Sequence, residues 1–511
     1  MDTFQTVIAR DFGAIADLIA IHARQNPDRP ALRDADTTLN FDALDALMDR
    51  IAASLQREGL GAGDAIAICA ASSVPYAVVF LGALRAGVAV APLAPGSTSA
   101  SLARMMEDAE ARLLFIDAST AGVVGDQTML PRITLDGSTA GRAFEDWLAP
   151  VGARPAPVDV QPSWPFNIIY SSGTTGEPKG IVQGHGMRWA HVQRGAKYGY
   201  DSETVTLLST PLYSNTTLVV FFPTLAFGGS VILMAKFDAV GYLALAARHR
   251  VTHTMLVPVQ YQRLMAHPAF DTYDLSSFRS KFSTSAPFGA ALKADVLARW
   301  PGGLIEFYGM TEGGGTCILE AHLHPTKLHT VGKAAEGSDI RLIDEEGREV
   351  EAGADGEVVG SSAGMMTGYH RQPDKTREAE WFDTTGKRFI RTGDVGRFDA
   401  DGFLTLFDRK KDMVISGGFN IYPSDLEAVV RAHPAVADVA VVGVPSELWG
   451  ETPVAFVVRR AGDDTTSDAL LEWTNAQLGK TQRLSALLWI DELPRSAIGK
   501  VLKRELRVRV R

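Results

Sequence analysis

Apolar residues recur along the first 260 positions with two alternating periods, one typical of helices and one typical of strands. Residues 42–58 carry helical spacing, and short apolar runs at residues 64–69 and 88–92 then flank a second helical segment at residues 75–86. Two strands joined by a crossover helix make a βαβ unit, and the pattern returns over residues 204–257. This alternation predicts an α/β fold with doubly wound sheets, whose ligands bind beyond the carboxyl ends of the strands.

The pattern changes near residue 331, where short strands separated by glycine and acidic residues replace the α/β alternation. A chain of 511 residues is also too long for one hydrophobic core, because cores stop growing at about 250–300 residues. We therefore expect a large, multi-sheet N-terminal domain over residues 1–408, with a β-rich subdomain at about residues 331–408. A hinge at residues 409–412 and a small α+β C-terminal domain at residues 413–511 complete the prediction.

Composition narrows the choice of partners and of cellular location. Fifty basic and sixty acidic residues give a formal net charge of −10, which argues against nucleic acid or an anionic membrane as a partner. Cys69 and Cys317 lie too far apart in the sequence to indicate a disulfide framework or a thiolate zinc site. The start of the chain lacks a signal-peptide pattern, and the apolar stretch at residues 218–235 is interrupted by Pro223 and two glycines. We expect a cytoplasmic protein without a membrane span.

A turn rich in glycine and hydroxyls follows the apolar run at residues 166–169. Glycines let backbone N–H groups approach an anion, the hydroxyls add donors, and Lys179 adds a positive charge, so the turn suits a nucleoside triphosphate. The spacing is not that of a Walker A loop, because Gly180 follows the lysine where that loop has Ser or Thr. A flexible surface loop is the alternative for this stretch alone. The residues expected to contact phosphate are Ser171, Ser172, Gly173, Thr174, Thr175 and Gly176.

Residues 170–180, Tyr-Ser-Ser-Gly-Thr-Thr-Gly-Glu-Pro-Lys-Gly, resemble the phosphate loop of the adenylate-forming superfamily, which contains acyl- and aryl-CoA synthetases, peptide-synthetase adenylation domains and beetle luciferases. Residues 283–290 and 306–312 resemble two further motifs of that superfamily, in the same order. In the second of these, Thr311 offers a hydroxyl to the α-phosphate and Glu312 a carboxylate to Mg²⁺. The resemblance implies ATP or AMP contacts by Ser285, Ala286, Pro287, Phe307, Tyr308 and Gly309, and a metal site at Glu312 and Thr175.

Two further motifs fall near the expected domain boundary. Asp394 ends a Thr-Gly-Asp string that resembles the ribose-binding motif of the superfamily, and an acceptor-only carboxylate suits two ribose hydroxyls. By itself, such an aspartate would be read as part of a hairpin turn. The charge run at residues 408–412 would by itself be read as a solvated linker. The resemblance makes it a hinge, with Arg409 contacting ribose or phosphate and Lys411 as the pivot.

The last hundred residues carry two more matching strings. The loop Gly417-Gly418-Phe419 resembles a glycine loop of the superfamily and implies a channel for the pantetheine arm of CoA, because glycines let a ligand pass close to the backbone. Residues 494–500 resemble the motif that carries the adenylation lysine, which is Lys500 here. The basic tail at residues 503–511 is interpreted as a solvated helix end.

The resemblance also indicates where the acid binds, although the residues that line this pocket are less diagnostic. Glycines near the backbone would admit a flat ring, threonines could meet a ring hydroxyl or methoxyl, and the absence of a basic residue disfavours dicarboxylic acids. Many members of the superfamily have histidine at the position of Ser214, so their route for the acid does not transfer. The lining is expected to include Tyr213, Ser214, Thr216, Thr217, Gly309, Gly313, Gly314 and Gly315, with Cys317 nearby.

The reaction implied by the resemblance is ATP-dependent ligation of a carboxylic acid to CoA through an acyl-adenylate, with ATP, Mg²⁺ and CoA required. Lys500, Thr311, Glu312 and Lys179 would carry the adenylation step, and no general base is assigned to the thiol step. An aromatic or hydroxycinnamic acid is favoured. The alternatives are a medium-chain fatty acyl-CoA synthetase, an adenylation enzyme that loads a carrier protein, and a non-catalytic ATP-binding regulatory protein. Monomer and homodimer both remain open.

Overall fold

A computed structural model describes most of the chain, and its first compact unit contains the N-terminal two thirds. The described residues are 3–125, 128–171, 179–409, 412–416, 419–447, 449–479, 482–496 and 499–510. The first unit comprises Met1–Leu328, Ala334–Asp339 and Ser361–Ile390. The second comprises His329–Lys333, Ile340–Gly360 and Arg391–Arg511.

One sheet of the first unit contains eight strands among the described residues, in the order β19-β9-β8-β4-β3-β5-β6-β7. The strands are β3 (Ala65–Cys69), β4 (Ala89–Pro92), β5 (Ala111–Ile116), β6 (Arg132–Thr134), β7 (Arg142–Ala143), β8 (Pro165–Ser171), β9 (Lys179–Gly184) and β19 (Gly368–Tyr369). From β8 through β7 the neighbouring strands run parallel, whereas β9 is antiparallel to both β8 and β19. The expected βαβ unit is therefore present, and β8 and β9 form a hairpin around the glycine-rich turn.

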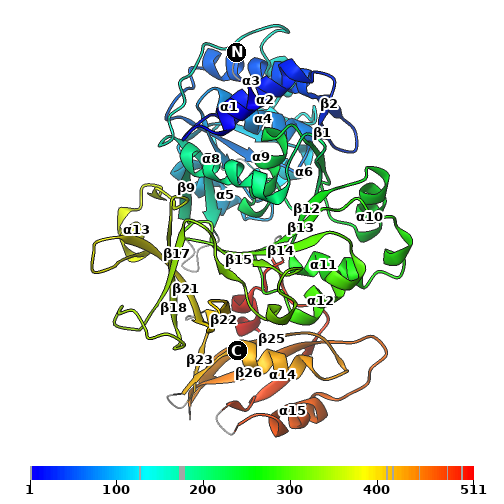
Figure 1. The fold of residues 1–511 in the computed structure, drawn as a ribbon, viewed down its shortest axis with the longest axis vertical. Helices are drawn as coiled ribbons and strands as arrows, with labels where there is room; N and C mark the ends of the chain where they lie inside the picture. The colour runs from blue at the N-terminus through cyan, green and yellow to red at the C-terminus, as the bar shows by residue number, and fades with distance from the viewer. Residues whose placement is uncertain are drawn as a thin grey trace. The chain divides into compact units, whose positions relative to one another are not determined.

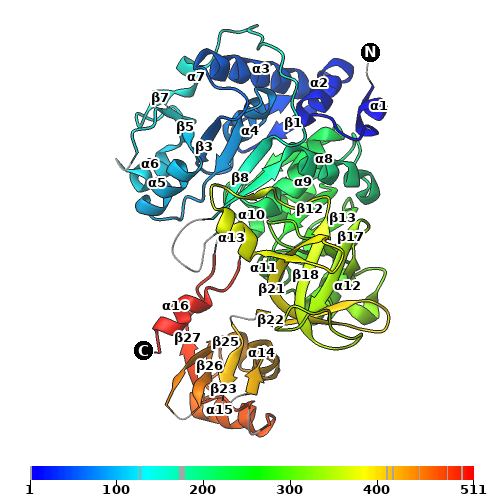
Figure 2. The same cartoon turned by 90° about the vertical axis from the view of Figure 1, so that its left-hand side faces the viewer.

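Alternating side chains of β3 explain why helices cover both faces of this sheet. Ile66 and Ile68 join the large core that includes helices α3 (Phe41–Arg57) and α4 (Val74–Arg85). Ala67 and Cys69 point the other way and join a smaller core with α5 (Ser99–Asp108) and α6 (Ala118–Val124). Figure 2 shows α3 and α4 on one side of the sheet and α5 and α6 on the other.

The second sheet of the first unit has nine strands in the described part of the chain, in the order β16-β15-β14-β13-β12-β10-β11-β1-β2. They are β1 (Pro30–Arg33), β2 (Thr38–Asn40), β10 (Val205–Leu208), β11 (Ser230–Leu233), β12 (His253–Leu256), β13 (Ser280–Ser283), β14 (Gly303–Tyr308), β15 (Cys317–Glu320) and β16 (Lys333–Ala334). The strands β10 to β14 and β1 run parallel, so the loops after β13 and β14 leave the same edge. This edge is where the sequence predicts ligand binding.

The remaining helical elements of the first unit pack around these two sheets (Figure 1). They are α1 (Phe4–Ile8), α2 (Ile15–Gln25), α7 (Phe144–Trp147), α8 (His185–Gln193), η1 (Arg194–Tyr198), α9 (Asn215–Ala226), α10 (Ala239–Arg248), α11 (Pro258–Met265), η2 (Phe270–Thr272), α12 (Ala290–Arg299), η3 (Pro325–Lys327) and α13 (Pro373–Glu378). The apolar stretch at residues 218–235 is split between α9 and β11, as expected. In the part of the chain that the structure describes, no helix is long and apolar enough to cross a membrane.

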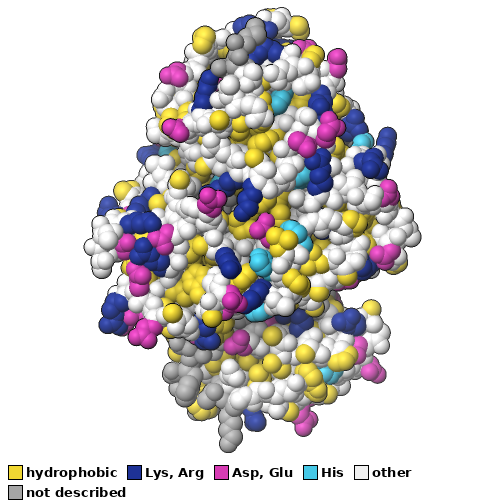
Figure 3. Space-filling view, in the orientation of Figure 1, with side chains coloured by type: hydrophobic (Ala, Val, Ile, Leu, Met, Phe, Trp, Pro, Cys, Tyr) yellow, Lys and Arg dark blue, Asp and Glu magenta, His cyan; other side chains and the backbone are white. Residues whose placement is uncertain are grey.

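A β-rich sheet follows, with the strand order β17-β18-β21-β20 and β22 paired with β21. Its strands are β17 (Ser338–Ile343), β18 (Gly356–Ser362), β20 (Glu380–Phe382), β21 (Arg388–Phe398) and β22 (Leu404–Arg409). Strands thus replace the α/β alternation after residue 331, but β21 spans 11 residues and is longer than the short strands expected there. On the face displayed in Figure 3, basic and acidic side chains are interspersed rather than gathered by sign.

The last sheet has the order β24-β23-β26-β25, with β27 paired with β26, and helices pack on both of its faces. Its elements are β23 (Val414–Ser416), β24 (Phe419–Ile421), α14 (Pro423–Arg431), β25 (Val436–Ser446), β26 (Gly450–Arg459), α15 (Ser467–Ala476), β27 (Ala486–Ile490) and α16 (Lys503–Val508). Val439 and Val441 face α14 and α15, whereas Ala440 and Val442 face α16. The α/β fold class, with a small α+β C-terminal part, is confirmed.

One expectation about the C-terminal end is wrong. The tail forms α16, and its Leu506 is fully buried in the core beside β25 and β26. Apolar residues four positions apart give this short helix an inward face that the density of basic residues concealed. Two ion pairs at 3.0 Å, Lys503 with Glu427 and Arg507 with Asp412, hold its charged side chains. The tail is a packed helix, not a solvated end.

Candidate active site

Several of the expected site residues lie outside the described residues, or their side chains do. These are Ser172, Gly173, Thr174, Thr175 and Gly176 of the phosphate loop, Lys411 of the hinge, and Gly417 and Gly418 of the glycine loop. The side chains of Ser171, Arg409 and Phe419 are likewise not described. The site is therefore built from the segments that flank these residues.

The two strands that flank the phosphate loop are fixed at their ends. In the β8–β9 hairpin, Tyr170 lies opposite Gly180. The Tyr170 hydroxyl donates to Asp108 Oδ2, at the end of α5, over 2.7 Å, and burial raises the pKa of this phenol, so it remains a donor. A Cβ on Gly180 would lie 2.9 Å from the same Asp108 oxygen, and the Gly180 carbonyl accepts from the His370 N–H at 2.7 Å. Tyr170 and Gly180, which form the base or neck of the phosphate loop, are thus fixed by Asp108 on one side and by the His370 backbone on the other.

Lys179, Glu312 and Tyr369 meet beside this neck. The Tyr369 hydroxyl donates to Glu312 Oε1 at 2.9 Å, and Lys179 Nζ lies 5.1 Å from the centroid of the Tyr369 ring. Burial, followed by the Glu312 charge, raises the pKa of the Tyr369 phenol. The strand pair β19–β9 sets Tyr369 opposite Ile181, two positions after the lysine. A basic and an acidic residue expected to serve ATP therefore share one aromatic neighbour.

A buried polar network anchors the Thr311-Glu312 backbone. Gln183 of β9 donates through Nε2 to the Thr311 carbonyl at 2.7 Å, and Asn167 of β8 donates to Gln183 Oε1 at 2.9 Å. Arg188 of α8 donates to both amide oxygens, and burial lowers the pKa of its guanidinium to about 9. The Glu312 carbonyl accepts from the Met366 N–H at 2.7 Å. Both carbonyls of the motif are held, which preorganises it.

The loops expected to bind adenine begin at neighbouring positions of the nine-stranded sheet, where Ser283 of β13 pairs with Glu306 of β14. The Phe307 ring stacks on Phe282 at a centroid distance of 5.6 Å, so this side chain supports the loop from the core side. Glu306 is buried in an ion pair with Lys293, and burial raises the pKa of its carboxyl to about 7. Tyr308 follows at the strand end, with its side chain half-buried.

Ser285 has an unusual backbone conformation. Its φ of 79° lies in the left-handed region, which costs a non-glycine residue conformational energy. Its hydroxyl lies 2.5 Å from Thr216 Oγ1, near the start of α9. The loop after β13, expected to bind adenine, is therefore tied to the helix expected to bind the acid.

The start of α9 shows which hydroxyls of the expected acid pocket are already engaged. Ser214 is the N-cap of α9, and its Oγ accepts from the Thr216 N–H at 3.3 Å, so the serine that replaces histidine has a structural task. The Thr217 side chain is fully buried, and its hydroxyl bonds to Thr210 Oγ1 at 2.8 Å and to the Pro211 carbonyl at 2.7 Å. Thr217 therefore has no spare donor for a substrate. Burial also raises the pKa of Tyr213.

The room expected beside Gly313 is absent. Its φ of 73° is left-handed, and a Cβ there would lie 1.8 Å from the Gly364 carbonyl oxygen. The space that a side chain would take is filled by backbone, so this glycine serves the fold and does not widen a substrate slot. At Gly309 the nearest atom to such a Cβ is the Gly315 carbonyl oxygen, at 3.3 Å, which leaves more freedom.

In the second unit, Asp394 lies in strand β21, and the backbone of Lys500 is hydrogen-bonded to Ser496. The Asp394 N–H donates to Thr392 Oγ1 at 3.0 Å, and the backbone of Asp394 pairs with that of Arg409 across β21 and β22. The Lys500 N–H donates to Ser496 Oγ at 3.2 Å, and the Lys500 carbonyl accepts from the Ser496 N–H at 2.8 Å. The described residues of both motifs thus take part in local hydrogen bonds.

Comparison with known proteins identifies the family. Residues 19–370 match the model of AMP-binding enzymes, and residues 425–500 match the AMP-binding enzyme C-terminal domain. The chain belongs to the AMP-binding enzyme family. The expected adenylate-forming superfamily and the expected enzyme class, an AMP-forming acid–thiol ligase, are thereby confirmed.

This AMP-binding enzyme is similar to other proteins over nearly its whole length. It is 32% identical over 501 residues to a feruloyl-CoA synthase from Amycolatopsis sp, covering 95% of this chain and 97% of the relative. It is 31% identical over 500 residues to the fatty acid–[acyl-carrier-protein] ligase ScoC from Streptomyces coeruleorubidus, covering 96% and 95%. The crystal structure of ATP-bound MatB from Rhodopseudomonas palustris is 30% identical in sequence and has a TM-score of 0.86. The match covers 97% of this chain and 98% of the MatB chain.

The residues of this AMP-binding enzyme fit a magnesium ion that arrives with ATP. Within the described ranges there is no cluster of three or more His, Cys, Asp or Glu that could hold a resident metal. Mg²⁺ commonly binds through one or two carboxylates together with substrate phosphates. The carboxylate of Glu312, oriented at one oxygen by Tyr369, fits that pattern.

Tyr369, Gln183 and Met366 contact the site although no sequence motif points to them. Each contacts the Thr311-Glu312 segment from at least 54 positions away in the chain, so no local pattern announces the contact. The strand β19 contains only two residues, which is too short for a periodic signal. Only the glycine before Tyr369 hints at a close approach.

Proposed function

We propose that this AMP-binding enzyme activates a hydrophobic monocarboxylic acid, preferably aromatic or hydroxycinnamic, with ATP·Mg²⁺ and transfers the acyl group to CoA. The observation that carries the proposal is the meeting of Lys179, Glu312 and Tyr369 beside the neck of the phosphate loop. A positive charge and a metal-binding carboxylate there suit the two ends of a magnesium-bound triphosphate. A protein that only binds nucleotide would not need Lys500 in its motif as well.

In the first step a carboxylate oxygen of the acid attacks the α-phosphorus, the bond to the bridging oxygen breaks, and pyrophosphate leaves. Lys179 and the phosphate-loop residues 171–176 hold the β- and γ-phosphates, and Thr311 contacts the α-phosphate. Lys500 stabilises the charge that develops on the carboxylate and α-phosphate oxygens. Catalysis here is positioning and charge stabilisation, which the fixed Thr311 and Glu312 carbonyls support.

In the second step the CoA sulfur attacks the acyl carbon, the mixed anhydride breaks, and AMP leaves with the bonding electron pair while the thiol gives up its proton. We assign the ribose to Asp394 and Arg409, the adenine to Tyr308 with residues 285–287, and the pantetheine channel to residues 417–419. The division into residues 1–408, a hinge at residues 409–412 with Lys411 as pivot, and residues 413–511 belongs to this proposal. No general base is assigned to the thiol.

The choice of acid is supported by the pocket segments and by one relative. The expected lining carries aromatic and small residues, among them Tyr213, Gly309 and Gly314, and no basic side chain for a second carboxylate. The feruloyl-CoA synthase relative covers nearly the whole chain and acts, by its name, on an aromatic acid. The second candidate is loading of a fatty acid onto a carrier protein, which the similarly distant ScoC relative supports.

Pyrophosphate release with mixed carboxylic acids tests the adenylation, and specificity constants identify the acid. The full-length enzyme is assayed with 4-coumarate, ferulate, benzoate, hexanoate and octanoate, each with CoA or with a phosphopantetheinylated carrier protein. We expect the highest kcat/KM for a hydroxycinnamate with CoA. A preference for octanoate with the carrier protein would favour the second candidate, and the absence of pyrophosphate release with every acid would reject both.

A further inference from the structure

Residues 366–370 cross the face of the candidate site where no motif predicted a contribution. The segment begins where the Met366 N–H bonds to the Glu312 carbonyl and ends where the His370 N–H bonds to the Gly180 carbonyl, each at 2.7 Å. Between these points β19 pairs with β9. The segment therefore links the Thr-Glu motif to the strand that follows the phosphate loop, and Tyr369 lies between the two attachments.

The hydroxyl of Tyr369 has a defined partner. It donates to Glu312 Oε1 at 2.9 Å, and the carboxylate can only accept while it is ionised. The phenol is largely buried, with 8% of the residue exposed, and its hydroxyl is directed at the carboxylate. One carboxylate oxygen is thus oriented by a neutral donor, and no side chain among the described residues donates to the other.

The ring of Tyr369 has a second partner. Lys179 Nζ lies 5.1 Å from the ring centroid, within the range at which an ammonium is attracted to the face of an aromatic ring. A lysine side chain has four rotatable bonds, so a platform of this kind restricts where its charge lies. The same side chain therefore fixes the direction of the acidic group and the place of the basic group.

We propose that Tyr369 is a positioning residue for ATP·Mg²⁺, whose hydroxyl orients the Glu312 carboxylate toward the metal and whose ring holds the Lys179 ammonium for the phosphates. The proposal rests on the proposed function and adds that the hydroxyl and the ring of one side chain have separate roles. Losing the hydroxyl weakens the response to Mg²⁺, whereas losing the ring also weakens the binding of ATP.

Two variants of the full-length enzyme separate the two roles. Tyr369→Phe keeps the ring and should raise the Mg²⁺ concentration for half-maximal pyrophosphate release about tenfold, since a hydrogen bond to a charged group is lost. Its KM for ATP at saturating Mg²⁺ should change less than about twofold. Tyr369→Leu should show the same Mg²⁺ shift and, in addition, raise this KM about fivefold, as expected for a lost cation–π contact. Thioester formation from synthetic acyl-adenylate should be unaffected in both variants.

Tyr242→Phe is the matched control, because Tyr242 is likewise a buried tyrosine and donates to a side-chain oxygen, Thr254 Oγ1, at 2.7 Å in another part of the first unit. It should lower the unfolding temperature as Tyr369→Phe does but leave the Mg²⁺ dependence unchanged. A wild-type Mg²⁺ dependence in Tyr369→Phe, or an equal shift in the control, would overturn the proposal. Calorimetric titration with ATP, with and without Mg²⁺, decides the same question even if no acid is activated, so failure of the proposed function stays distinguishable.

Discussion

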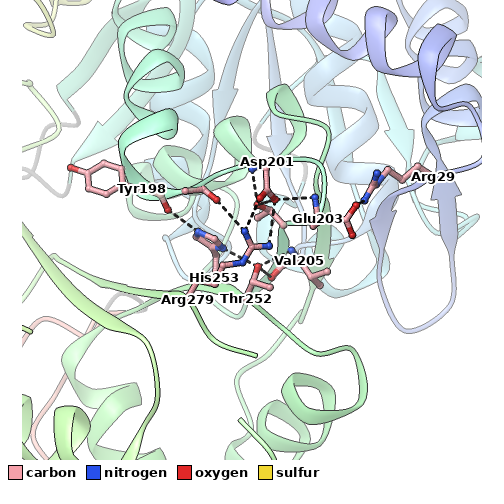
Figure 4. Close-up of polar contacts among 10 residues, drawn as sticks. Arg29, Tyr198, Asp201, Glu203, Val205, Thr252, His253 and Arg279 are labelled. Carbon is pink, nitrogen blue, oxygen red and sulfur yellow. Dashed lines mark hydrogen bonds and ion pairs between the residues drawn. The ribbon is translucent and has the colours of Figure 1, made fainter. Parts of the chain in front are cut away.

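The two edges of the nine-stranded sheet both carry polar clusters, but only one of them carries the candidate site. At the amino ends of β12 and β13, His253 donates through Nε2 to the Tyr198 carbonyl at 3.0 Å, and its Nδ1 lies 2.9 Å from Thr252 Oγ1. Arg279 pairs with Asp201 at 2.8 Å (Figure 4). Each of these side chains is hydrogen-bonded or ion-paired to a neighbouring side chain or to the backbone. The cluster therefore stabilises the sheet and offers few polar groups to a ligand.

The carboxyl edge is built differently. There Ser285 is held in a left-handed conformation, and Gly313 is packed against the Gly364 carbonyl. Strain at a non-glycine residue such as Ser285 persists only where the surroundings impose it. Arg250, just before the amino end of β12, is also left-handed, with a φ of 49°. The comparison therefore teaches that the direction of the strands marks the site better than the density of polar residues does.

The largest effect is expected at the carboxyl edge, for Gly313→Ala. A Cβ would meet the Gly364 carbonyl oxygen and the left-handed φ would add strain, so the free energy of unfolding should fall by about 4 kcal/mol. Urea unfolding measures this, with Gly122→Ala in α6 as control. A Cβ at Gly122 has nothing within 4 Å, so this helical variant should be neutral or up to about 1 kcal/mol more stable. Wild-type stability of Gly313→Ala would mean that room exists at this position after all.

The next effect tests whether the chemistry needs the second unit as well as the sheet edge. Lys500→Ala should reduce the rate of adenylate formation by about 10²–10³, as for one lost transition-state donor, while synthetic acyl-adenylate and CoA still react at nearly the wild-type rate. Rapid-quench measurement of each half-reaction checks this. An equal loss in both half-reactions would reject the assignment of Lys500 to adenylation alone.

At the amino edge, we expect a change of pH to alter the free energy of unfolding and not the catalytic rate. The pKa of His253 is lowered to about 4, chiefly by burial and in smaller part by Arg279, while the Tyr198 carbonyl and Asp201 act in the opposite direction. Because the unfolded state takes up the proton first, the stability contributed by the neutral ring is present above pH 6.5 and is lost as the pH falls toward 4. Between pH 7 and pH 5 this histidine should account for about 1–2 kcal/mol of lost stability.

His253→Asn should remove that part of the pH dependence while the other buried histidines keep theirs. Urea unfolding at pH 5 and pH 7 gives the difference for each protein, which is independent of the absolute cost of the substitution. The kcat and KM of His253→Asn at pH 7 should remain those of the wild type. A changed KM for ATP or acid would break the comparison, because it would give the amino edge a role in binding.

The sequence predicts the elements of the fold better than it predicts the contacts of the site. The βαβ unit around β3 and β4 and the division of residues 218–235 follow from periodicity, and the motif residues Glu312 and Asp394 follow from local strings. Tyr369 and Gln183 could not be found in this way, since their partners are 57 and 128 positions away. Gly313 was read as empty space because a sequence does not show that another backbone segment fills it. The packing of the tail does not follow from the sequence, because its many charges conceal the two apolar side chains, Leu506 and Val510, that reach the core.

The smallest effect concerns the link between the two loops of the carboxyl edge, the hydroxyl pair of Ser285 and Thr216. Ser285→Ala and Thr216→Val each remove this hydrogen bond, worth about 1 kcal/mol, and each should raise the KM for the acid about threefold with little change in kcat. The double variant should be no worse than either single one, because both remove the same bond. Ser285→Gly also loses the hydroxyl but relieves the left-handed strain, so it should be about 1 kcal/mol more stable than Ser285→Ala at a similar KM. Additive effects in the double variant would show that the two hydroxyls act separately and do not link the two loops.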